Sequence, residues 1–151
     1  MQLYTIDIKK YKTIYFQILV TNLAAIVGSF LLVKNGLYIL SIFDPAKKLT
    51  LPILFLLLIL SGFHTRYQRK QLTRLAGIAD FDTRVGEYEK FYRFRMLWFL
   101  LSCLVTCFLC VLTGRYTFLF YAGFDVLISL PFYPGLLLFK KELKNEEIIF
   151  Y

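Results

Sequence analysis

The chain has 151 residues, of which 58% are hydrophobic and 19% aromatic, and its mean hydropathy is +0.61. A single domain of this length cannot bury so much apolar surface in water, so the composition excludes an ordinary soluble protein and indicates one embedded in a lipid bilayer. The formal net charge of +8 comes from basic residues that flank apolar segments. We expect no nucleic-acid partner, because no nucleic-acid-binding module accompanies this charge.

A first membrane span is predicted over residues 13–33, which at about 1.5 Å per residue cross the ~30 Å hydrocarbon core. No small-residue cleavage site follows, so we expect the segment to be retained rather than removed as a signal peptide. Thr21 and Asn22 are polar positions near or below the midplane. Small residues from Ala24 to Ser29 would let another helix approach closely.

A second span is predicted over residues 50–66, after a short apolar segment at 37–43 that we expect to lie in the membrane interface. The second apolar run is short for a bilayer. We therefore expect its helix to continue through basic residues to about Ala76, where Gly77 ends it.

A third helix is expected to start after Asp80 or Asp82, either of which is a suitable N-cap, and to cross the membrane over residues 94–113. The second and third helices then form a hairpin with a basic helical extension on the cytoplasmic side. One face of this extension carries four basic residues and no acid, which predicts binding of anionic headgroups or of an acidic partner. These residues are Arg66, Arg69, Lys70 and Arg74.

A fourth span is predicted over residues 116–131, where Pro131 interrupts it, and Pro134 opens a basic cytoplasmic tail helix over residues 134–151. Fourteen of the 18 Lys and Arg residues then lie on one side of the membrane. The positive-inside rule therefore predicts a bacterial inner-membrane protein with both termini in the cytoplasm. The predicted fold is all-α, with four transmembrane helices built as two hairpins.

Residues 85–144 resemble a group of small, uncharacterised four-span inner-membrane proteins of the Bacteroidota type. The shared features are the Tyr88–Arg95 run, Leu112-Thr113-Gly114, Ala122-Gly123 and Pro134. The resemblance implies a four-span protein of about this length and implies no activity. Asp125 departs from the pattern, because that position is usually apolar in the group.

Asp125 is the only acidic residue inside a predicted span. A charged group at that depth costs at least ~2.5–3.5 kcal/mol on insertion scales, so it is a functional candidate by default. Two interpretations remain open from the sequence. Asp125 serves as a proton relay, or it forms a hydrogen bond that holds the helices or an oligomer together, with Asn22, Thr21 and Lys34 as candidate partners.

Cys103, Cys107 and Cys110 fall on one helical face, and Cys107 and Cys110 form a C-x-x-C pair. Membrane thiol oxidases also need a second cysteine pair, which this chain lacks, so we interpret the cysteines as small apolar packing residues.

His64 has no ligand partner at a suitable spacing in the sequence, so we expect no metal site there. No cofactor motif and no catalytic constellation appears, so we expect no enzyme activity.

Three functions follow, in order of preference. The first is an accessory, assembly or scaffolding subunit of a membrane complex, or a self-associating bundle. The second is an oligomeric ion or proton pathway that uses Asp125. The third is a membrane thiol-redox protein that uses Cys107 and Cys110.

Overall fold

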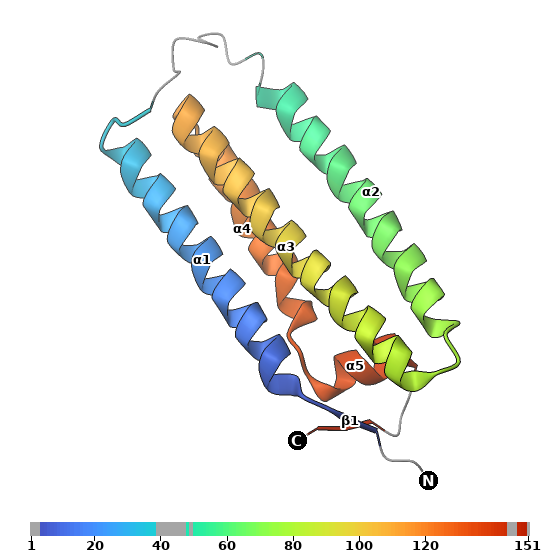
Figure 1. Ribbon diagram of the computed structural model, residues 1–151. Coiled ribbons are helices and arrows are strands. Elements are labelled where there is room, and N and C mark those ends of the chain that lie inside the picture. Colours follow the sequence, from blue (N-terminus) through green and yellow to red (C-terminus); the bar gives the residue numbers. More distant parts are fainter. Residues whose placement is uncertain (1–3, 39–47, 49, 145–147, 151) are drawn as a thin grey trace.

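The structure, a computed structural model, describes residues 4–38, 48, 50–144 and 148–150. Its elements follow the chain as a series of helices with one short strand near each end (Figure 1). They are β1 (Tyr4–Ile6), α1 (Ile8–Lys34), α2 (Thr50–Ala76), α3 (Phe81–Thr113), α4 (Thr117–Ser129), the 3-10 turn η1 (Leu130–Phe132), α5 (Leu136–Leu143) and β2 (Ile148–Phe150). Most of the expected 37–43 segment lies outside the described residues.

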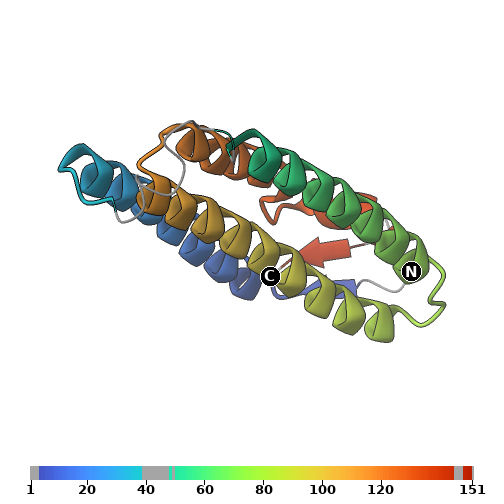
Figure 2. The same ribbon diagram turned by 90° about the horizontal axis from the view of Figure 1, so that it is seen from above.

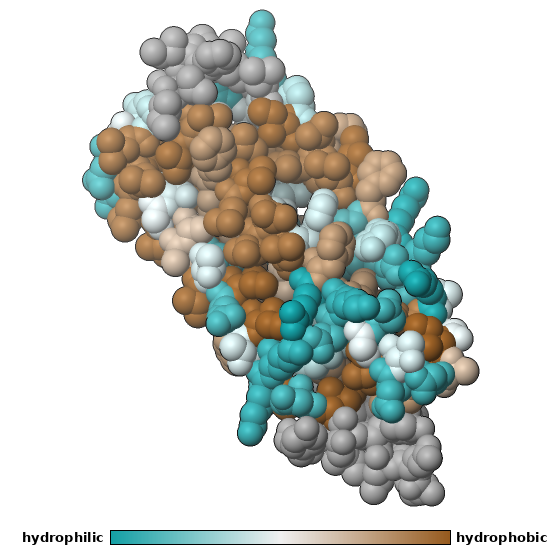
Figure 3. Space-filling model, viewed as in Figure 1, coloured by the Kyte–Doolittle hydropathy of each residue, from teal (hydrophilic) through white to brown (hydrophobic). Residues whose placement is uncertain are grey.

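The helices α1, α3 and α4 pack closely together, and α3 runs between α1 and α2 in both views (Figures 1 and 2). Both termini, α5 and the turn between α2 and α3 lie at the same end of the molecule, which we call the basic end. Figure 3 shows that apolar side chains cover the opposite half, whereas hydrophilic side chains gather toward the basic end.

Three helices, α1, α2 and α3, are long and apolar enough to cross a membrane. A fourth crossing results if α4 with η1 and α5 are taken as one span, which is bent by 81° at the break between them. These helices indicate an integral membrane protein. The bend follows from Pro131 and Pro134, since neither residue can donate the backbone hydrogen bond that would continue a helix.

Local signals explain where the long helices begin and end. The Asp80 carboxylate caps α3 by accepting the Thr83 amide at 2.9 Å, and the hydroxyl of Thr83 donates to the same oxygen. These two hydrogen bonds hold the pKa of Asp80 below its usual range. Gly114 ends α3 in the left-handed conformation at φ 69°, which glycine adopts without strain.

The C-terminal region differs from the predicted helix over residues 134–151. Helix α5 covers only Leu136–Leu143, because Lys144 adopts a left-handed conformation at φ 50° that ends it. The backbone of Ile148–Phe150 then pairs in parallel with Tyr4–Ile6, in the register Tyr4 to Ile148. The two ends of the chain therefore satisfy each other's backbone hydrogen bonds, which no local pattern in the tail predicts.

The largest apolar core lies at the basic end rather than in the apolar half. It consists of Ile6, Ile8, Tyr11, Tyr15, Leu75, Phe81, Tyr88, Phe91, Tyr92, Met96, Phe99, Phe139 and Leu143. The ring of Tyr11 packs edge-on against Tyr92 and Phe139, with centroids 5.2 and 5.0 Å away. The ends of α1, α3 and α5 are thereby joined, while α2 contributes only Leu75 to the buried members of this core.

Candidate functional site

An ion pair between a fully buried arginine and a largely buried glutamate lies within this core. The side chain of Arg95 on α3 has no exposed surface, and its Nη1 lies 3.0 Å from Oε1 and 3.1 Å from Oε2 of Glu142 on α5. The guanidinium carbon also lies 4.4 Å from the ring centre of Phe91 and 4.5 Å from that of Phe132. Both rings offer a favourable π-face to this cation, whose own side chain is fully buried.

Further polar contacts from α3 hold α5 and η1 in place. The hydroxyl of Tyr88 donates to Glu142 Oε2 at 2.5 Å, so this carboxylate bonds two residues of α3. The hydroxyl of Tyr92 donates to the Phe132 carbonyl at 3.1 Å. Arg84 Nη1 donates to the Leu143 carbonyl at 3.0 Å, which satisfies a terminal carbonyl of α5.

Two donors of Arg95, Nε and Nη2, have no hydrogen-bond partner among the described residues. The ion pair with Glu142 is therefore the main compensation for burying this cation. Sequence analysis counted Arg95 only as one of many basic residues and overlooked it as a structural centre. Its place among aromatic residues, after Phe91 and Tyr92, was the available signal.

Asp125 is buried where α4 packs on α3, and its Oδ2 accepts a hydrogen bond of 2.5 Å from the hydroxyl of Ser102. This partner is not one of the three residues suggested by the sequence. Thr21 is exposed and donates to the carbonyl of Gln17 within its own helix. Asp125 instead finds its partner on α3, the helix that packs directly against α4.

Asn22 is buried at a different contact, between α1 and α3. Its Nδ2 lies 3.5 Å from the Phe99 carbonyl, and the thiol of Cys103 lies 3.9 Å from the Asn22 carbonyl. Among the described residues no hydrogen bond joins Asn22 to Asp125. The intramembrane polar residues thus form two separate interhelical contacts rather than one chain of hydrogen bonds.

The three cysteines are buried, and each packs in an apolar cluster. Cys103 and Cys107 lie with Ala122 of α4, whereas Cys110 lies with Val33 of α1 and Phe118 of α4. Within the part of the chain that the structure describes, no group of three or more His, Cys, Asp or Glu residues has the geometry to hold a metal ion.

His64 joins α2 to α3. Its ring stacks on Trp98 with a centroid separation of 4.3 Å and an interplanar angle of 6°, and Gln68 Nε2 lies 2.5 Å from its Nε2. Sequence analysis found no partner for His64 at a ligand spacing. The structure instead makes it one of two buried residues of α2, together with Leu75.

Helix α2 contacts the rest of the protein through one narrow stripe. Between the two ends of the helix, the stripe consists of the buried and half-buried residues Ile53, Leu54, Leu57, Ser61, His64, Gln68, Gln71, Leu72 and Leu75. The opposite side is open, as the exposed fractions of Leu51 (74%), Phe55 (65%) and Phe63 (64%) show.

The four basic residues predicted to form one face are all exposed. Two of them line different hollows of the protein. Arg66 lines a notch on α2, and Arg74 lines a cleft between α2 and α3.

The notch lies on the open side of α2, where Gly62 has no side chain. Ile59, Phe63 and Arg66 surround it, and its volume is about 240 Å³. A Cβ atom added at Gly62 would meet no atom within 4 Å. A backbone exposed in this way lets a second helix pack closely against a membrane helix.

Comparison of the chain with protein-family profiles, curated proteins and solved structures gave no match.

Proposed function

We propose that this protein is a non-catalytic accessory, assembly or scaffolding subunit of a bacterial inner-membrane complex. The observation that carries the proposal is the open side of α2, with its glycine notch ending at Arg66. Lipid can cover apolar side chains, but it gains little from a shaped notch. A neighbouring helix gains van der Waals contact there, which is what drives helix association in bilayers.

The polar groups inside the helices support the same role. Ser102 and Asp125 join α3 to α4, and Arg95 and Glu142 join α3 to α5. Each is used in a contact that holds two elements of this chain together. A closely packed α1–α3–α4 unit beside an α2 with only two buried residues suits a protein that docks against other membrane helices.

Cross-linking tests this function directly. We expect a photoreactive phenylalanine at position 63, beside the notch, to cross-link a membrane protein in native membranes. The matched control is position 120 on α4, whose phenylalanine is also exposed, at 81% against 64%. It should give no cross-linked protein. Filling the notch by Gly62→Leu should abolish the cross-link at 63, because a second helix could no longer approach the backbone.

The same cross-linking experiment can also contradict the proposed docking. The absence of a protein adduct at position 63, or an adduct that survives Gly62→Leu, would contradict docking at the notch. The thermal unfolding of Gly62→Leu in detergent should match that of the original chain, since nothing within the protein fills that space. A purified pore-forming oligomer with ion flux would favour the pathway function instead.

We further propose four crossings with both termini in the cytoplasm. The shared position of both termini and the α2–α3 turn at the basic end supports this orientation, as does the excess of Lys and Arg there (Figure 1). Reporter fusions after Asn35 and Arg115 are expected to indicate the periplasm, and fusions after Gly77 and Tyr151 the cytoplasm. A periplasmic signal at Gly77 would refute the orientation.

A further inference from the structure

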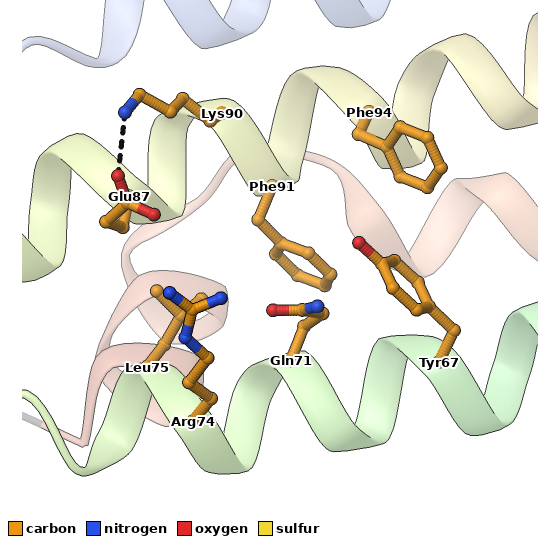
Figure 4. Close-up of a pocket in the computed structure, with 8 residues that line it drawn as sticks. All are labelled: Tyr67, Gln71, Arg74, Leu75, Glu87, Lys90, Phe91 and Phe94. Carbon is orange, nitrogen blue, oxygen red and sulfur yellow. Dashed lines mark hydrogen bonds and ion pairs between the residues drawn. The ribbon is translucent and has the colours of Figure 1, made fainter.

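The second hollow of the protein is a cleft of about 250 Å³ between α2 and α3. Figure 4 shows Tyr67 and Gln71 extending from α2 toward the ring of Phe91 on α3, with Phe94 beside Tyr67. The rings of Tyr67 and Phe94 meet edge-on with centroids 5.5 Å apart. The cleft is therefore aromatic at the end nearer the apolar half of the molecule.

The other end of the cleft is polar and carries a positive charge. Arg74 and Lys90 are its cations, and the only carboxylate in the lining, that of Glu87, is paired with Lys90 at 2.7 Å. The Arg74 guanidinium makes no hydrogen bond or ion pair with another described residue, although, after the larger effect of Lys90, its charge helps to lower the pKa of Glu87. Its guanidinium extends from α2 into the cleft beside Leu75, on the side of Glu87 (Figure 4). The side chains of Gln71 and Tyr67 add an amide and a hydroxyl donor on the same helix face.

A helix length and the predicted start of the third span place this cleft at the headgroup level. The ~30 Å hydrocarbon core requires about 20 helical residues, so a crossing of α2 that begins at Thr50 reaches its far edge near residue 69. The corresponding edge on α3 lies near residue 94, where the predicted span begins. Tyr67 and Phe94 thus lie at the edge of the hydrocarbon, and Arg74 lies beyond it, where phosphate groups are found.

We propose that this cleft binds the headgroup of one anionic phospholipid, such as phosphatidylglycerol. Arg74 bonds the phosphate, since a guanidinium presents a planar fork of donors that matches phosphate oxygens. Gln71 and Tyr67 supply further donors, and the acyl chains leave the cleft past Phe94 into the bilayer. This site is narrower than the basic face predicted from the sequence, because only Arg74 of the four residues of that face lines the cleft. It does not depend on the proposed scaffolding function.

Native mass spectrometry of the full chain in mild detergent, titrated with phosphatidylglycerol, tests the site. We expect one lipid to bind, and Arg74→Gln to weaken this binding about tenfold, as expected for the loss of one charge-assisted hydrogen bond. Arg69→Gln is the matched control, because it removes the same charge from an exposed position of the same helix outside the cleft. It should weaken binding less than about threefold, as expected for a screened surface charge.

Three results would overturn the proposal. Equal losses for Arg74→Gln and Arg69→Gln would indicate attraction by a diffuse basic surface. Equally tight binding of phosphatidylcholine would show that the site does not select a negative charge. Displacement of the lipid by an acidic protein segment in an Arg74-dependent manner would make the cleft a protein-binding site. Unchanged unfolding of both variants, followed by Trp98 fluorescence, confirms that each is folded.

Discussion

Glu142→Ala is expected to lower the free energy of unfolding by about 3–5 kcal/mol, the usual loss when one member of a buried ion pair is removed. The variant leaves the fully buried Arg95 without its carboxylate and Tyr88 without its acceptor. Detergent-based unfolding followed by Trp98 fluorescence measures the change. It also reports on α2, because Trp98 stacks on His64.

Glu87→Ala is the matched control for this prediction. It removes a carboxylate at the same end of the molecule, but its partner Lys90 is 78% exposed, so the loss should stay within about 0.5 kcal/mol. An Arg95→Met/Glu142→Leu double variant should recover most of the stability, since an apolar pair needs no compensating charge. If Glu142→Ala unfolded like Glu87→Ala, the ion pair would not be the centre that holds α5.

Asp125→Leu is expected to destabilise the protein by about 0.6–2 kcal/mol, the range for a hydrogen bond between membrane helices. The substitution removes the acceptor for Ser102 at the contact of α3 with α4. Asp125→Asn should retain assembly, because its side-chain oxygen can accept the same hydrogen bond. Unfolding measurements on Asp125→Leu, Ser102→Ala and the double variant should show losses that are not additive, as expected for two partners of one bond.

Flux measurements distinguish this structural role from a proton pathway. Proteoliposomes that contain the original chain should show no pH-dependent proton flux above that of empty liposomes, and Asp125→Asn should not change this. If the original chain conducted protons and a folded Asp125→Asn variant did not, the structural role would fail. A titrating carboxylate at Asp125 would then carry the function.

Much of the fold could be predicted because it depends on neighbours in the sequence. The extent of α2 follows from a continuous apolar run that passes into a helix-forming basic segment and ends before Gly77. The start and end of α3 follow from Asp80, whose carboxylate caps the first turn, and from Gly114, which adopts a left-handed conformation. Such signals operate within one or two helical turns, so a single sequence contains them completely.

The sequence by itself indicated a membrane protein and, apart from the C-terminal tail, which of the described segments are helical. Only the tertiary structure decided how polar residues are paired and which helix stays open. Glu142 lies 47 residues from Arg95, and β2 pairs with the opposite end of the chain. The notch on α2 and the cleft beside Arg74 depend likewise on how α2 packs against α3. Periodicity shows that a helix has an apolar face, but in a bilayer lipid and protein are equally apolar surroundings. Which of them covers that face is therefore decided by side-chain packing between distant segments.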